Sequence, residues 1–147
     1  MNERTAMRFA DKICLVTGGG SGIGRAACER FAKEGGKVTV VDLKEEHGNQ
    51  TVQAIQGNGG EAFFAKANVG SADEIKTSIQ ATVAKWGRID VLVNDAAMMT
   101  FVPVLDLPDD DWDQVLRVNL KSVFLYCKYA VPHMGPGSAI VNVSSVH

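Results

Sequence analysis

Short apolar runs alternate along the chain with segments in which apolar residues recur every three or four positions. The runs are typical of strands buried on both faces, and the spaced pattern is typical of amphipathic helices. The predicted strands cover residues 13–16, 38–41, 62–65, 89–93 and 139–143. The predicted helices cover residues 23–34, 45–55, 72–86 and 108–131. This alternation predicts an α/β fold, a doubly wound parallel sheet with helices on both faces and the strand order 3-2-1-4-5.

The last predicted helix begins at Pro108, which three acidic residues follow. Proline is tolerated at the first helical position, and acidic side chains favour the positive end of a helix dipole. We therefore interpret the acidic residues as a helix start and not as a metal site. The apolar face expected for this helix comprises Val115, Val118, Phe124, Cys127 and Val131.

A glycine-rich turn joins the first strand to the first helix. Its spacing is T-G-x-x-x-G-x-G and not the common G-x-G-x-x-G, because the third glycine of that pattern would fall on Ile23 or Arg25. Free N–H groups at a helix start bind phosphate, and glycine allows a close approach. A flexible turn is the alternative, but it does not account for the position between a strand and a helix. The candidate cofactor-binding residues are Thr17, Gly18, Ser21, Gly22, Ile23 and Gly24.

Asp42 closes the second strand, 18 residues after Gly24. An acid at about this distance binds the ribose hydroxyls of a dinucleotide and repels a 2′-phosphate. Because glycine occupies positions 19 and 20, no basic side chain is present there to meet such a phosphate, and we expect NAD rather than NADP. Lys44 is the nearby cation that argues for NADP, and a strand-end turn is the alternative role for Asp42.

The glycine turn resembles that of the short-chain dehydrogenase/reductase family, and a second motif supports the resemblance. Asn94-Asp95-Ala96-Ala97 follows the fourth strand and is similar to the family's N-N-A-G. Asn94 and Ala96 match, whereas Asp95 and Ala97 depart from the pattern. The resemblance implies a Rossmann-like fold in which Asn94 supports the centre of the sheet and the backbone at Ala96 lies near the adenosine.

Asn68 and Val69 follow the third strand, where the family usually has Asp-Val. The resemblance implies that Asn68 meets the adenine amino group and that Val69 packs on the adenine face. A loop asparagine at a strand end is the alternative for Asn68.

The resemblance also implies two catalytic residues. Asn119 lies in Val118-Asn119-Leu120 on the last helix, where the family's asparagine distorts the helix and holds a proton-relaying water. Ser145 ends an I-V-N-x-S-S pattern and would orient the substrate oxygen. A core asparagine and two strand-end serines are the alternatives.

The family's Tyr-x-x-x-Lys pair does not occur in the 147 residues. Tyr126 and Tyr129 are the two tyrosines present, and neither has a lysine four positions later. We interpret residues 1–8 as an N-terminal tail and residues 9–147 as a partial dinucleotide-binding domain, truncated before that motif. We expect it to retain much of the adenosine site, to have little activity alone and to leave its fifth strand as an exposed edge.

Composition excludes several functions. The net charge of −2 offers no electrostatic attraction for nucleic acid, and no apolar run is long enough to span a membrane. The first eight residues lack the apolar region of a signal peptide, and the three cysteines are widely spaced, which together favour a cytoplasmic location. The cysteines and the three scattered histidines predict no metal site.

The sequence therefore predicts an NAD-dependent oxidoreductase that acts on a small alcohol or carbonyl substrate and, by resemblance, forms a homo-oligomer. A non-catalytic NAD-binding module and a regulatory or assembly protein are the alternatives. Met98, Met99 and Phe101 follow the fourth strand and either line a substrate pocket or pack internally; they do not identify the substrate.

Overall fold

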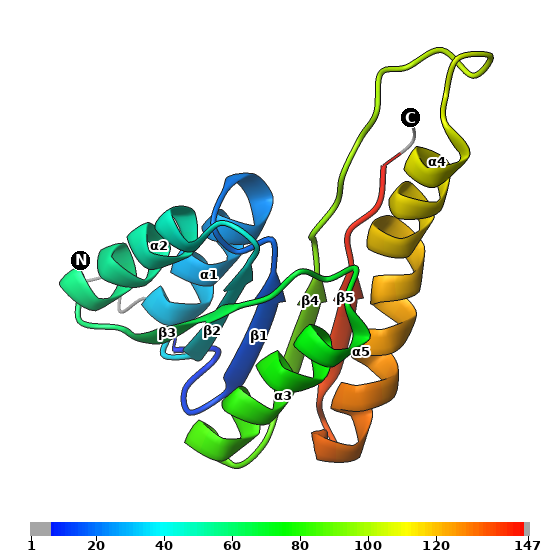
Figure 1. Ribbon diagram of the computed structural model, residues 1–147. Coiled ribbons are helices and arrows are strands. Elements are labelled where there is room, and N and C mark those ends of the chain that lie inside the picture. Colours follow the sequence, from blue (N-terminus) through cyan, green and yellow to red (C-terminus); the bar gives the residue numbers. More distant parts are fainter. Residues whose placement is uncertain (1–6, 146–147) are drawn as a thin grey trace.

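A computed structural model of the chain describes residues 7–145, which form one parallel sheet with the order β3-β2-β1-β4-β5 (Figure 1). The strands are β1 (Ile13–Thr17), β2 (Lys37–Asp42), β3 (Glu61–Lys66), β4 (Val91–Asn94) and β5 (Ala139–Asn142). The α-helices are α1 (Gly22–Lys33), α2 (Glu45–Gly57), α3 (Ala72–Trp86), α4 (Asp109–Leu116) and α5 (Ser122–Ala130). A π-helical turn (Arg117–Lys121) joins α4 to α5, and a 3-10 turn (Val131–His133) follows α5. The predicted fold class and strand order are confirmed.

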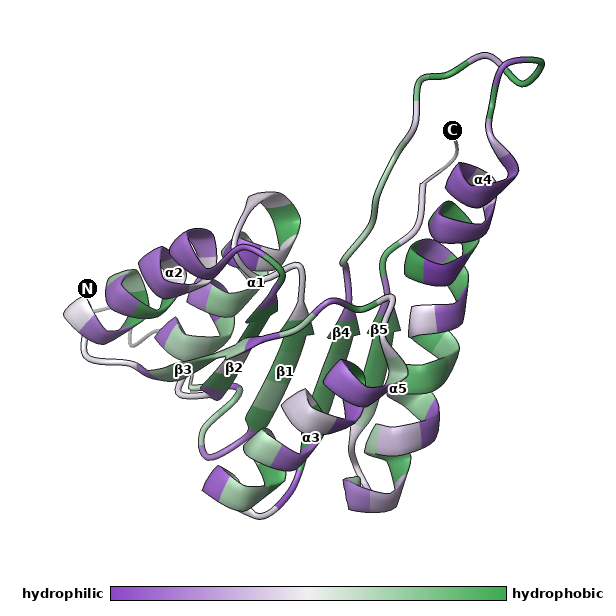
Figure 2. Ribbon diagram, viewed as in Figure 1, coloured by the Kyte–Doolittle hydropathy of each residue, from purple (hydrophilic) through white to green (hydrophobic). Residues whose placement is uncertain are grey.

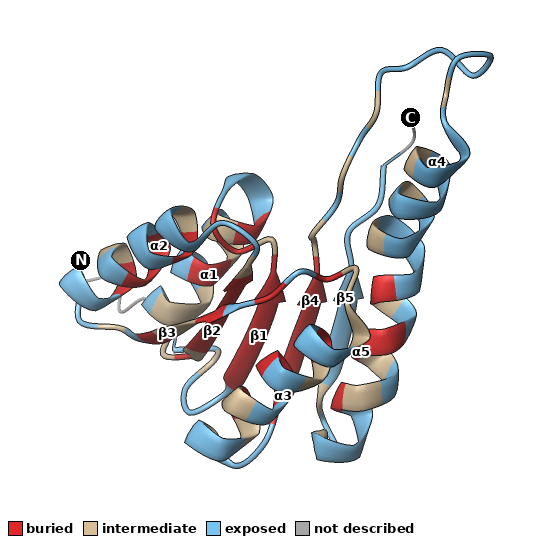
Figure 3. Ribbon diagram, viewed as in Figure 1, coloured by how far each residue is buried: buried red, intermediate tan, exposed pale blue. Residues whose placement is uncertain are grey.

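Helices cover both faces of the sheet (Figure 1). On one face, α1 and α2 contribute Cys28, Val52 and Ile55 to a core with alternate residues of β1 and β2. On the other face, α3 and α5 contribute Ile79 and Tyr126, among others, to a second core. Every residue of β1 is buried, because this strand lies at the centre of the sheet and is covered on both sides (Figure 3).

The β5 side of the molecule is much less covered. All four residues of β5 are exposed, and α4 has no buried residue (Figure 3). Figure 2 shows hydrophobic residues along this strand and on the neighbouring helices. Leu116, Leu120 and Phe124, spaced four residues apart, form an exposed apolar stripe. β5 is therefore an unpaired edge strand on its outer side.

The apolar face predicted for the last helix is partly wrong. Phe124 and Val131 are exposed, whereas Leu125, Tyr126 and Ala130 are buried. The buried residues Ser122, Leu125, Tyr126 and Ala130 recur at the three- and four-residue spacing of one helical face, and Phe124 and Val131 fall on the opposite side of the helix. This face packs Leu125 and Tyr126 against the sheet.

A buried carboxylate fixes the segment before β1 to the end of α1. The side chain of Glu34 is 1% exposed and pairs with the guanidinium groups of Arg8 and Arg30. Phe9 packs edge-on against Phe31 beside it. Hydrogen bonds from the two arginines, that of Arg8 foremost, lower the pKa of Glu34 to about 2. Residues 1–6 of the predicted tail lie outside the described residues.

We predict that Glu34→Gln lowers the melting temperature at pH 7 and reduces the loss of stability in acid. Because the folded-state pKa of Glu34 is depressed from 4.5 to about 2, its contribution is present above pH 4.5 and is lost as the pH falls towards 2. Melting temperatures measured between pH 7 and 2 should therefore converge for the two chains at the acid end. Glu29→Gln, which removes an exposed pair with Arg25, is the control. Parallel curves across the whole range would contradict the role given to Glu34.

We predict that Tyr126→Phe destabilises the fold by about 1 kcal/mol, the net value of one hydrogen bond. The Tyr126 hydroxyl lies 2.9 Å from Ser78 Oγ, and both groups are buried. Ser78 keeps its bond to the Ile75 carbonyl, so the loss is limited to one interaction. Urea unfolding measures the change, with Tyr129→Phe as the partly exposed control. A difference of zero between the two variants would show that the buried bond contributes nothing.

Candidate functional site

The side chain of Thr17 fastens the glycine turn to the neighbouring strand. Thr17 is the last residue of β1 and is buried. Its hydroxyl oxygen accepts hydrogen bonds from the backbone N–H groups of Asp95, at 3.0 Å, and Ala96, at 3.1 Å. Because these two residues follow β4, the hydroxyl joins the carboxyl ends of β1 and β4. These neighbouring strands lie where the strand order reverses, which is where ligands bind in open α/β sheets.

Two glycines allow the start of α1 to lie directly on the turn. A Cβ atom at position 24 would lie 2.2 Å from the carbonyl oxygen of Gly18, so only glycine fits there without a backbone shift. Gly18 itself has φ +67° and would place a Cβ 3.0 Å from the Cα of Ala96. The close approach holds the first turn of α1 at the carboxyl end of β1. This position matches the phosphate site of the predicted cradle.

The other residues of the turn leave this helix start open. Gly22 has φ +52° and nothing within 4 Å of a Cβ placed on it, and Ile23 is 66% exposed. Ser21 is the N-cap residue, but its side chain makes no capping hydrogen bond. Free N–H groups in the first turn of a helix can therefore meet an anion here.

Asp42 faces the glycine turn from the end of β2. Its Oδ2 accepts a hydrogen bond of 2.9 Å from Gly20 N, and its Oδ1 accepts one of 2.9 Å from Lys44 N. A Cβ at position 20 would lie 2.8 Å from Asp42 Oδ2 and 2.8 Å from His47 Cβ. The turn and the carboxylate are thus one packed unit. Each carboxylate oxygen retains a further lone pair with which to accept a hydroxyl.

The structure gives Asn68 and Val69 local roles. Asn68 Oδ1 accepts a hydrogen bond of 2.8 Å from Gly70 N, which is an Asx turn at the end of β3. Val69 is 8% exposed and packs in the core with Leu15 and Ile75. The predicted contact of Val69 with an adenine face stays a prediction.

Asn94 links the two last strands of the sheet. It is buried, and its Nδ2 donates to Asn142 Oδ1 at 2.9 Å. Its own Oδ1 is buried and has no hydrogen-bond partner among the described residues. Ala96, two positions later, is partly buried and makes the backbone contact with Thr17 already described. Asn94 thus lies between strands, as its sequence motif implied.

Asn119 lies within the π-helical turn, so the helix distortion implied for this residue is present. Its Oδ1 accepts from Met98 N and its Nδ2 donates to Met98 O, both at 2.8 Å. The side chain therefore holds the segment after β4. Ser145 is exposed and lies three residues after Asn142, at the same edge of the sheet.

Tyr126 and the apolar side chains after β4 differ sharply in exposure. Tyr126 is buried with its hydroxyl 2.9 Å from Ser78 Oγ, and burial raises the pKa of its phenol. Met99 and Phe101 are 72% and 89% exposed on the segment that projects beyond the sheet (Figure 1). Of the two alternatives for that segment, internal packing is wrong for these residues.

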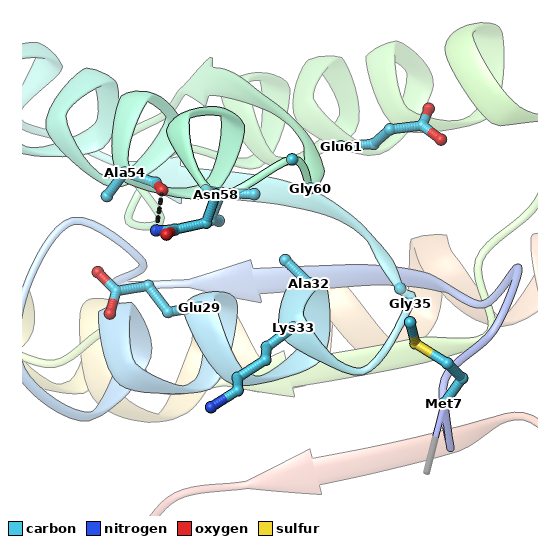
Figure 4. Close-up of a pocket in the computed structure, with 12 residues that line it drawn as sticks. Met7, Glu29, Ala32, Lys33, Gly35, Ala54, Asn58, Gly60 and Glu61 are labelled. Carbon is cyan, nitrogen blue, oxygen red and sulfur yellow. Dashed lines mark hydrogen bonds between the residues drawn. The ribbon is translucent and has the colours of Figure 1, made fainter. Parts of the chain in front are cut away.

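A cavity of about 620 Å³ lies at the other end of the strands, beside the starts of β2 and β3 (Figure 4). The ends of α1 and α2 form two of its walls, for example through Lys33 and Asn58. Gly60, which precedes β3, and Glu61, its first residue, also line it. Asn58 is engaged in a 2.8 Å bond to the Ala54 carbonyl. None of the predicted site residues lines it, so this cavity is separate from the glycine turn.

Residues 7–145 contain neither a metal-binding cluster nor a membrane-spanning helix. No group of three or more His, Cys, Asp or Glu residues there could hold a metal ion. No helix in the same range is long and apolar enough to cross a membrane.

One feature of the site was missed from the sequence. The carboxyl group of Asp95 lies beside the first turn of α1, since a Cβ placed on Gly24 would be 2.9 Å from Asp95 Oδ2. Asp95 had been noted only as a departure from N-N-A-G. That departure, in a motif next to a predicted phosphate cradle, was the available signal.

Comparisons with known proteins agree with this geometry. Residues 12–147 match the family described as short chain dehydrogenase. The chain is 46% identical over 141 residues to a 3beta-hydroxysteroid dehydrogenase of Mediterraneibacter gnavus, covering 95% of this chain and 51% of that protein. It is 37% identical over 142 residues to a cyclopentanol dehydrogenase of Comamonas testosteroni, covering 95% of this chain and 57% of the relative.

A solved structure shows the same arrangement. A dehydrogenase/reductase from Sinorhizobium meliloti superimposes with a TM-score of 0.91 at 33% identity, over 96% of this chain and 56% of that one. The chain thus spans about half the length of the relatives it matches. The turn between β1 and α1, the strand order and the family match over residues 12–147 lead to one assignment: the chain belongs to the short-chain dehydrogenase family.

Proposed function

We propose that the protein is an NAD-dependent oxidoreductase that transfers hydride between the nicotinamide and an alcohol or carbonyl substrate. The observation that carries the proposal is the Asp42 carboxylate, which a 2.9 Å hydrogen bond holds against the glycine turn. The turn and the acid would bind two adjacent parts of one dinucleotide. The dehydrogenases among the relatives support the same reaction class.

The residues present fit the pyrophosphate of such a cofactor. The close contact of Gly24 with Gly18 keeps the first turn of α1 at the site, and the open surface at Gly22 leaves room for phosphate oxygens. The N–H groups of this turn and the positive end of the helix dipole would bind the negative charge.

Asp42 would select NAD over NADP. Its oxygens would accept hydrogen bonds from the adenosine ribose hydroxyls, and its charge would repel a 2′-phosphate. The backbone N–H of Lys44 donates to the Asp42 carboxylate and helps to hold it in place. This contact does not involve the charged side chain of Lys44.

Asn119 and Ser145 would serve the chemical step. The Ser145 hydroxyl would donate to the substrate oxygen and stabilise the charge that develops there. Asn119, held by both polar groups of the Met98 backbone, would keep the floor of the site in place. When bound, the nicotinamide of NAD would accept the hydride. We expect residues 1–147 alone to bind nucleotide with little turnover, because they contain no Tyr-x-x-x-Lys pair to hold the nicotinamide ribose and supply the proton.

We also propose a homo-oligomer for the protein. The exposed apolar stripe of Leu116, Leu120 and Phe124 supports this proposal, because contiguous exposed apolar surface marks association sites.

Asp42→Asn should weaken NAD binding about tenfold and reduce the preference for NAD over NADP, because one charge-assisted hydrogen bond is lost together with the repulsion of the 2′-phosphate. Calorimetric titration of residues 1–147 with NAD, NADP and ADP-ribose measures both effects. Glu45→Gln, an exposed acid at the start of α2, is the control. If the unaltered chain binds no nucleotide, or binds NAD and NADP equally, the proposed cofactor is wrong.

Gly24→Ala should abolish measurable nucleotide binding and lower the melting temperature, because the new Cβ would lie 2.2 Å from a backbone oxygen and force α1 away from the turn. Gly57→Ala is the matched control, since a Cβ there has nothing within 4 Å. Titration and thermal unfolding of both variants test the expectation. Equal NAD affinity in Gly24→Ala and the unaltered chain would refute the close-approach argument.

A further inference from the structure

Two carboxylates flank the glycine turn, and the proposed function uses only one of them. Asp42 accepts from Gly20 N on one side. On the other side lies Asp95, whose Oδ2 would be 2.9 Å from a Cβ placed on Gly24. The second carboxylate therefore touches the first turn of α1.

The backbone around Asp95 holds its side chain at this place. Its N–H donates to Thr17 Oγ1 at 3.0 Å, in the same bond pair that ties β4 to β1. Asp95 is partly buried. Burial raises the pKa of its carboxyl group, and the Gly24 backbone N–H opposes this rise. The chain after β4 thus places the carboxyl group close to the start of α1.

The charges nearby do not neutralise this carboxylate by pairing with it. Arg25, the residue after Gly24, directs its Nε to Glu29 on the next turn, at 2.8 Å. Asp42 adds a second negative charge on the far side of the turn. The positive end of the α1 dipole is the feature that attracts the Asp95 carboxylate, as it attracts anions in general.

A bound pyrophosphate and Asp95 would seek the same helix start. The phosphate needs the N–H groups and the dipole of the first turn, against which the Asp95 carboxylate already lies. Its charge would also repel the phosphate across a partly desolvated space, where electrostatic interactions are stronger than in water.

We propose that Asp95 is an internal anion that competes with the cofactor's pyrophosphate for the start of α1 and so limits the affinity of this chain for dinucleotides. This inference rests on the proposed function. Asp95 is a positioning residue that also sets affinity; it is not assigned to the chemical step.

Asp95→Asn tests the proposal, because the amide keeps an oxygen that can accept from Gly24 N–H and removes the charge. We expect NAD and ADP-ribose to bind roughly three- to tenfold more tightly to the variant, as removal of one nearby like charge predicts. The gain should shrink as salt is raised, because salt screens charge. Adenosine, which carries no phosphate, should bind equally to both chains in ligand-observed NMR titration.

Asp73→Asn is the matched control, since Asp73 lies in the first turn of α3 and undergoes the same change of charge far from the glycine turn. It should leave NAD affinity unchanged. Asp95→Ser is measured alongside, so that a folded, uncharged variant is available if the amide is not tolerated.

The outcomes separate the two proposals. Absence of NAD binding to the unaltered chain refutes the proposed function and the inference with it. Binding to the unaltered chain, with no tighter binding to either uncharged variant, overturns the inference alone. A parallel loss of NAD and adenosine affinity also overturns it, because Asp95 would then be a structural clamp only.

Discussion

The structure depends on the contact between the start of α1 and the end of β1. Gly24 lies so close to Gly18 that no side chain fits between them, and this contact places the start of α1 at the carboxyl end of β1. The hydroxyl group of Thr17 then joins the end of β1 to the chain after β4. Without these short contacts, the strands would still pair, but the helix start and the chain after β4 would not converge on one point.

The two sides of the sheet centre differ in how complete they are. Towards β3, both faces are covered by α1, α2 and α3, and the strands are mostly buried. Towards β5, the strand is exposed and α4 stands clear of the core (Figure 3). Thr17 and Asp42, at the carboxyl ends of β1 and β2, are accordingly held by hydrogen bonds to neighbouring backbone, whereas Ser145 lies on an exposed segment. Relatives about twice as long have additional chain beyond the matched half.

The sequence was sufficient for most of the fold because buried parallel strands are continuous apolar runs, such as Ile13–Thr17, and glycines mark the helix ends. It also placed the glycine turn between β1 and α1 and Asp42 at the end of β2, where both lie. It was insufficient on the last helix, where the apolar side chains of Phe124 and Val131 are exposed. The buried face there includes the polar residues Ser122 and Tyr126, so apolar residues alone did not mark it.

Side-chain direction was the other limit, because it depends on the packing of distant segments. Val69 turned into the core, and Asn68 bonded to its own loop. Asp95 reached across to a helix 71 positions earlier in the chain, at Gly24. Such contacts are set by which strand ends meet, and this becomes known only once the sheet is assembled.

The two hydrogen bonds between the Asn119 side chain and the Met98 backbone explain why an amide suits this position. A primary amide is the side-chain group that mimics a peptide unit, offering one donor and one acceptor to the same backbone residue. A carboxylate at the same place would lack the donor, and a hydroxyl would be too short to reach both atoms. The two bonds to Met98 thus account for an amide at position 119 as part of the scaffold, in addition to the role in the site proposed for Asn119.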